Sequence, residues 1–205
     1  MTQPEDREAQ LPVIGEVDEE EGEFWVANPL DLPSLGENLS AYERNKLFLN
    51  VDGSRFVDAS FASSVDIDSD SRSVVAADFD RDGSVDLLVA SAGGGSLRMF
   101  SNKIEQGNRL EIRLKGVKSN RQGIGARIIA EFGEQKITRD LFPNNGFMGT
   151  GPAEVWLGIG EAPKIDKLTI RWPSGDVQEF QDVEVNRGVQ IEEGNAEIKT
   201  SRKFE

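Results

Sequence analysis

Short apolar runs alternate with turn-forming residues from position 45 onward, and this pattern restricts the possible fold more than any other feature. Residues 109–115 show it clearly, because Leu110, Ile112 and Leu114 fall on one face of an extended strand. Glycine punctuates the runs, with 21 glycines among 205 residues. No stretch keeps a helical period of apolar residues for more than about two turns. The sequence therefore predicts an all-β protein built from half-buried antiparallel strands.

The expected strands form two sets, one on each side of residue 104. The first set comprises residues 46–51, 55–58, 73–79, 85–91 and 97–101. The second set comprises residues 109–115, 126–132, 136–141, 155–157, 168–172, 177–180 and 189–191. In the first set, an aromatic-bearing run precedes an asparagine twice, at Asn50 and Asn102, a spacing compatible with propeller blades. A propeller needs about four to eight blades, so this chain alone cannot close one.

The residue types that are missing exclude several kinds of chemistry. The chain has no histidine and no cysteine, which removes His general bases, Ser-His triads, thiolate chemistry and His- or Cys-ligated metals. It carries 37 acidic against 23 basic residues, a net charge of −14, which argues against binding to nucleic acid. The side chains that remain for chemistry offer oxygen atoms, and these are the ligands that calcium prefers.

The first 40 residues differ in composition from the rest of the chain. They hold 11 acidic residues and one basic residue, which predicts a largely flexible acidic arm. Within this arm, residues 24–35 are apolar and contain two prolines, so they either pack on their own domain or dock on a partner. The candidate partner contacts are Phe24, Trp25, Leu30 and Leu32.

The strongest local motif is the run DFDRDGSVD at positions 78–86, which lies between two expected strands. Its acids stand at loop positions 1, 3, 5 and 9, and a glycine at position 6 permits a tight turn. The turn brings the carbonyl of position 7 toward the same point as the acids. An EF-hand would need a bidentate Glu at position 12, which here is Val89, and a helix after the loop. The motif thus predicts a calcium loop of the β type, the alternative being an acidic surface turn. The predicted ligands are Asp78, Asp80, Asp82, Ser84 and Asp86.

A weaker version of the same alternation occurs upstream, at Asp66, Asp68 and Asp70. It lacks the glycine at position 6 and the acid at position 9, which are Ser71 and Val74. This run is a candidate for a second, degenerate metal site, and the alternative is a solvated polar loop.

Six segments of the sequence resemble parts of two known families. The runs NKLFLN at 45–50 and LRMFSN at 97–102, together with the loop at 78–86, resemble an FG-GAP/VCBS-type propeller repeat. The runs KSNRQGIGAR at 118–127, WLGIG at 156–160 and IRWPSG at 170–175 resemble the ASPIC/UnbV domain of cartilage acidic protein-like chains.

The composition and the resemblance together divide the chain into four parts. The flexible arm, residues 1–40, would precede a partial FG-GAP/VCBS-like unit with the calcium loop at 41–104. An antiparallel, sandwich-like ASPIC/UnbV β domain would follow at 105–194, with a C-terminal tail at 195–205. The family implies secreted or cell-surface, calcium-binding proteins used mainly for interaction. The chain is therefore expected to be a non-catalytic module with a protein partner or a larger complex, with a glycan as a further candidate partner.

Two other functions stay open from the sequence. One is a carboxylate-based or calcium-assisted hydrolase of polysaccharides, since a pair of carboxylates suffices for glycoside hydrolysis. The other is a cytoplasmic acidic scaffold, because the sequence begins without the basic and apolar regions of a signal peptide. No apolar run is long enough to span a membrane. Location outside the cytoplasm is the expectation that the family resemblance favours.

Overall fold

The computed structural model describes residues 44–51, 53–67, 71–91, 96–105, 107–144, 146 and 149–204. The predicted acidic arm, with Phe24, Trp25, Leu30 and Leu32, lies outside the described residues, and so do Asp68 and Asp70. The described part holds 13 strands in four sheets and no helix, which confirms the all-β prediction. These four sheets do not close into a propeller.

The strands before residue 101 make two small sheets. Strands β1 (Phe48–Val51) and β2 (Arg55–Asp58) form an antiparallel hairpin. Strands β3 (Ser71–Ala77), β4 (Asp86–Ser91) and β5 (Arg98–Phe100) make a three-stranded sheet in the order β3-β4-β5. By compactness the chain divides into two units. The described residues of 74–88 and 99–204 belong to one unit, and those of 44–73 and 89–98 belong to the other.

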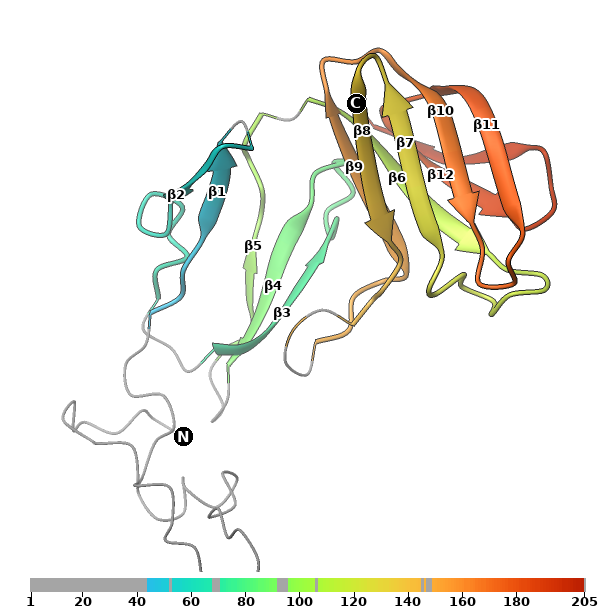
Figure 1. The fold of residues 1–205 in the computed structure, drawn as a ribbon. Helices are drawn as coiled ribbons and strands as arrows, with labels where there is room; N and C mark the ends of the chain where they lie inside the picture. Colours follow the sequence, from blue (N-terminus) through green and yellow to red (C-terminus); the bar gives the residue numbers. More distant parts are fainter. Residues whose placement is uncertain are drawn as a thin grey trace, which may run out of the picture. The chain divides into compact units, whose positions relative to one another are not determined.

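Residues 108–203 form the larger part of the fold, a pair of four-stranded sheets. One sheet has the order β11-β10-β7-β8, and the other has the order β13-β12-β6-β9. The bounds in chain order are β6 (Asn108–Lys115), β7 (Arg127–Phe132), β8 (Gln135–Asp140), β9 (Glu154–Gly160), β10 (Lys164–Arg171), β11 (Val177–Glu184), β12 (Arg187–Glu192) and β13 (Ile198–Lys203). Figure 1 shows the two sheets as separate layers.

A single apolar core lies between the two sheets, as the alternation of residues predicts for a sandwich. Leu110, Ile112 and Leu114 of β6 are all buried, which confirms that they share one inward face. Strands of both sheets contribute to this core, whose largest fully buried apolar side chains are Leu110, Ile112, Ile128, Leu141, Leu157, Ile165, Leu168, Ile170 and Ile191. The sandwich buries enough apolar surface to form a rigid support for the loops around it.

Two features of the sandwich differ from the sequence-based expectation. Neighbouring strands of the sandwich are antiparallel except for one central pair. Strand β12 runs parallel to β6, with Arg187 opposite Leu110. The predicted C-terminal tail contains strand β13, which pairs with the same β12. Neither pairing can be predicted from the local sequence. The residues of 198–203 are mostly polar, and the partners of a parallel pair lie far apart in sequence.

The turn between β10 and β11 follows the sequence closely. The amide of Gly175 donates to the carbonyl of Trp172, which closes the Pro-Ser-Gly turn predicted there. Gly175 has a φ of 93°, in the left-handed region that glycine adopts without strain. The turn places Ser174 at one end of the sandwich, where it takes part in the carboxylate cage described below.

Candidate metal centre

The loop between β3 and β4 brings three predicted ligands together. One carboxylate oxygen from each of Asp78, Asp80 and Asp86 lies within 4.8 Å of the others. Asp78 directly follows β3 and Asp86 begins β4, so the two strands fix the two ends of the loop. Three converging carboxylates make a ligand set that suits a hard divalent cation.

The loop is held in shape by its own backbone amides. The amide of Gly83 donates to Asp78 Oδ2 at 3.0 Å, and the amide of Phe79 donates to Asp86 Oδ2 at 3.0 Å. Asp86 Oδ1 accepts a further hydrogen bond from the amide of Asn102 at 2.8 Å, beyond β5. Both oxygens of Asp86 are therefore hydrogen-bonded, and its side chain is completely buried.

Asp78 differs from Asp86 in one respect. Its side chain is also completely buried, and its Oδ2 is bonded to Gly83 and to Arg202. Among the described residues, no donor lies within hydrogen-bond distance of Asp78 Oδ1. A buried carboxylate oxygen without a hydrogen bond costs free energy, and a cation at the acidic cluster would remove that cost.

The other two predicted ligands, Asp82 and Ser84, lie in the same loop. Asp82 Oδ1 accepts the amide of Ser84 at 2.8 Å, and Asp82 is not one of the three converging carboxylates. This backbone hydrogen bond, followed by the nearby ammonium of Lys103, lowers the pKa of Asp82. Ser84 is buried at the end of the loop.

Lys103 lies against the exposed side of the loop. Its Nζ is 3.4 Å from Asp80 Oδ2 and 3.3 Å from Asp82 Oδ2. The hydrogen bonds to Asp82 and Asp80 raise the pKa of Lys103. Ser101 also donates to Asp80 Oδ2, at 3.2 Å. The sequence motif at 97–102 ends one residue before this lysine, and no local signal connects Lys103 with the loop.

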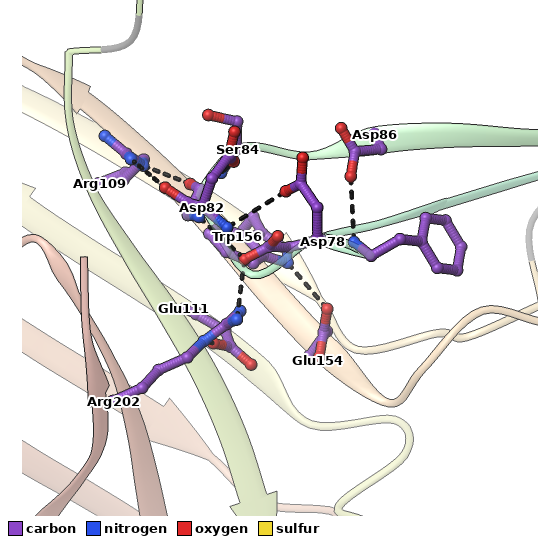
Figure 2. Close-up of polar contacts among 12 residues, drawn as sticks. Asp78, Asp82, Ser84, Asp86, Arg109, Glu111, Glu154, Trp156 and Arg202 are labelled. Atoms are coloured by element: carbon purple, nitrogen blue, oxygen red, sulfur yellow. Dashed lines mark hydrogen bonds and ion pairs between the residues drawn. The ribbon is translucent and has the colours of Figure 1, made fainter. Parts of the chain in front are cut away.

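Arg202 of β13 connects the loop to the sandwich. Its Nη1 is 2.8 Å from Asp78 Oδ2, and its Nε donates to Glu111 Oε2 at 2.7 Å (Figure 2). The guanidinium also lies over the stacked rings of Trp156 and Phe204, 5.5 and 5.0 Å from their centroids. Sequence reasoning missed Arg202, because it is 124 residues from Asp78 and lies in the segment expected to be a tail.

Glu111 is a buried acid on the outward face of β6. Burial raises its pKa, while the hydrogen bond from Arg202 and the charges of Arg113 and Arg202 act in the opposite direction. Arg113 Nε lies 2.7 Å from Glu111 Oε1, and Arg113 Nη2 lies 2.8 Å from Glu154. The ion pairs explain how a carboxylate is buried where alternation predicts a solvated side chain.

Gly83 is required in the loop for two reasons. Its φ of 84° favours glycine, as the motif predicts. In addition, a Cβ at this position would lie 2.7 Å from both Arg109 Nη2 and Phe204 Cγ. Arg109 donates to the carbonyls of Gly83 and Asp82, so the loop packs directly against β6 and the residue that follows β13.

Comparison with known families identifies one part of the chain. Residues 116–198 match the family model described as ASPIC and UnbV. This chain contains an ASPIC/UnbV domain. A search of curated proteins found no match. The family match begins after the acidic loop, so the FG-GAP-like character of residues 45–102 stays a prediction.

The ASPIC/UnbV domain contains a second carboxylate in a specific cage. Glu193 Oε2 accepts the amides of Val117, Lys118 and Ser119 at 2.6–2.7 Å. Its Oε1 accepts the hydroxyls of Ser119 and Ser174 at 2.8 and 2.6 Å. Burial alone would raise the pKa of Glu193, but these hydrogen bonds outweigh it and lower the pKa to about 2. Glu193 thereby ties the start of the motif at 118–127 to the β10–β11 turn.

The second metal candidate is described only at Asp66. Its Oδ2 is 3.4 Å from Arg44 Nη1, and its side chain is mostly buried. Asp68 and Asp70 lie outside the described residues, so this candidate stays a prediction. The described part of the chain also has no helix with the length and apolar character needed to cross a membrane.

Proposed function

We propose that this protein is a calcium-binding, non-catalytic interaction module that works outside the cytoplasm as a component of a larger assembly. The observation that carries the proposal is the convergence of Asp78, Asp80 and Asp86, together with the buried Asp78 Oδ1 that has no donor among the described residues. These two features favour a bound cation over an acidic surface turn, since a surface turn leaves its carboxylates in water.

Calcium fits the donor set better than zinc or copper. It takes six to eight oxygen ligands in a flexible arrangement, whereas zinc and copper sites usually include His or Cys, which this chain lacks. Asp78, Asp80 and Asp86 would supply carboxylates, and Asp82 with the carbonyl of Ser84 would complete the protein ligands. The bound ion would supply positive charge that holds the acids together, and it would thus act structurally.

An interaction role is supported by the exposed apolar side chains of the β1–β2 hairpin. Phe48 and Phe56 lie on one face of the hairpin, and Leu49 and Val57 lie on the other. All four side chains are exposed in the described structure, with Phe56 at 70%. A two-stranded hairpin is marginally stable alone, so apolar residues on both faces favour contact with further protein.

The test is thermal unfolding of the full chain in calcium and in chelator, for the wild type and two matched variants. Asp80→Asn removes a carboxylate of the cluster, and Asp176→Asn removes one from the β10–β11 turn. Both carboxylates are partly exposed and paired with a lysine, so the two variants lose the same charge in similar surroundings.

At 100 times its dissociation constant, calcium is expected to stabilise the wild type by about 2.7 kcal/mol, which raises Tm by several degrees. Asp176→Asn keeps this rise and Asp80→Asn loses most of it. A wild type whose Tm is the same in calcium and in chelator would show that the loop is an acidic turn and that the proposal is wrong.

A further inference from the structure

Among the described residues, two positively charged side chains contact the carboxylates of the acidic loop, and they are held very differently. Arg202 contacts Asp78, and its side chain is 23% exposed. Lys103 contacts Asp80 and Asp82, and its side chain is 70% exposed. The mostly buried cation is thus paired with Asp78, and the exposed cation is paired with other carboxylates of the loop.

Arg202 is fixed in place by its surroundings. The guanidinium is shared with Glu111 and lies over the rings of Trp156 and Phe204. It occupies Asp78 Oδ2 and leaves Oδ1 without a donor among the described residues. Arg202 therefore leaves the second oxygen of Asp78 available as a ligand atom.

Lys103 has no comparable restraint among the described residues. Its two contacts with carboxylates are 3.3 and 3.4 Å long, and the aliphatic stem of a lysine can rotate into water. One contact is to Asp80, which belongs to the group of three converging carboxylates. An ammonium and a divalent cation would compete for that carboxylate, because each gains from its negative charge.

We propose that Lys103 is a tethered competitor that calcium displaces from the loop, so that this lysine sets the calcium affinity of the site. The inference rests on the proposed function and adds a regulatory device to it. In the absence of calcium, the ammonium partly neutralises Asp80 and Asp82. When calcium binds, Lys103 moves into solvent and Arg202 stays in place.

The test compares the calcium affinity of full-length wild type, Lys103→Gln and Lys118→Gln by isothermal titration. Lys118 is a matched control, because it is also 70% exposed and pairs with a single carboxylate, that of Asp176. Lys103→Gln is expected to bind calcium about 1.5-fold to fivefold more tightly than the wild type, the range that the free energy of an exposed ion pair gives. Lys118→Gln is expected to bind with the wild-type affinity.

A second readout uses the wild type alone. Acetylation of Lys103 by a reagent specific for amines, followed by mass spectrometry, should speed up when calcium is added. The rate at Lys118 should not change. Both results together would support displacement of the ammonium.

The outcomes separate this inference from the proposed function. Calcium binding with equal affinity in wild type and Lys103→Gln, or an unchanged acetylation rate at Lys103, would overturn the inference and leave calcium binding intact. Binding in Lys103→Gln but not in wild type would show that the lysine blocks the loop and is not displaced by calcium, which would overturn both the inference and calcium binding by the native loop. Absence of binding in both proteins would overturn both.

Discussion

Two buried carboxylates of this protein, Glu193 and Asp78, are satisfied to different degrees. Glu193 accepts five hydrogen bonds, and both of its oxygens have donors. The side chain of Asp78 is completely buried, yet only one of its oxygens has donors among the described residues. The two acids are thus similar in burial but differ in what their surroundings supply.

The difference indicates separate roles. The cage around Glu193 provides everything that a buried carboxylate needs, so its charge serves to hold the ASPIC/UnbV domain together. One carboxylate oxygen of Asp78 has no donor among the described residues, and two more carboxylates converge with that of Asp78. This arrangement favours a ligand that the chain itself does not contain. Counting donors around a buried acid therefore helps to distinguish structural acids from candidate binding acids.

Removing the Glu193 carboxylate should produce the largest effect. Glu193→Ala leaves three backbone amides and two hydroxyls without their acceptor, and is expected to cost about 3 to 5 kcal/mol of unfolding free energy. Urea denaturation measures this loss. The calcium-dependent rise in Tm should remain in the variant, provided it stays folded. Loss of that rise would show that the two carboxylates are not independent.

The pH dependence of stability should show how much the ionised Glu193 contributes. The pKa of Glu193 is lowered from 4.5 to about 2, so its contribution is fully present above about pH 4.5 and is lost as pH falls toward 2. Urea denaturation between about pH 5 and pH 2 should show a steeper loss for wild type than for Glu193→Gln. Parallel curves for the two proteins would contradict the lowered pKa.

Removing one donor of the cage should have the smallest effect. Ser174→Ala deletes a single hydroxyl and leaves four donors to Glu193, so we expect a loss of about 1 kcal/mol. Thermal unfolding provides the measurement, with Thr138→Ala on β8 as a control for loss of an unrelated hydroxyl. A loss as large as that of Glu193→Ala would mean that the cage depends on Ser174 alone.

The sequence predicts the local parts of this fold well. The alternation of Leu110, Ile112 and Leu114 marks the inward face of β6, and the Pro-Ser-Gly run marks the β10–β11 turn. The spacing of Asp78, Asp80 and Asp86 predicts that their carboxylates converge, and they do. These signals are readable because strand period, turn chemistry and loop spacing depend on residues close together in the chain.

The parts that the sequence did not predict all depend on distant residues. The parallel pairing of β12 with β6, the burial of Glu111 and the contact of Arg202 with Asp78 join segments more than 70 residues apart. A period of two predicts which face of a strand is apolar but not which strand lies beside it. Nor does it show that an outward acid such as Glu111 will be covered by an arginine from another strand.

The pairing of β6 with β12 has a consequence for the order of folding on the ribosome. Residue 110 emerges long before its partner, residue 187, so the central β6–β12 pair cannot form until most of the chain has been made. Contacts of such long range slow folding and leave apolar edges exposed in the meantime. The contact between Arg202 and Asp78 forms later still, because Arg202 is made only after nearly the whole sandwich has been synthesised. A nascent chain that stops short of residue 202 would carry the acidic residues of the loop without the arginine that orients them.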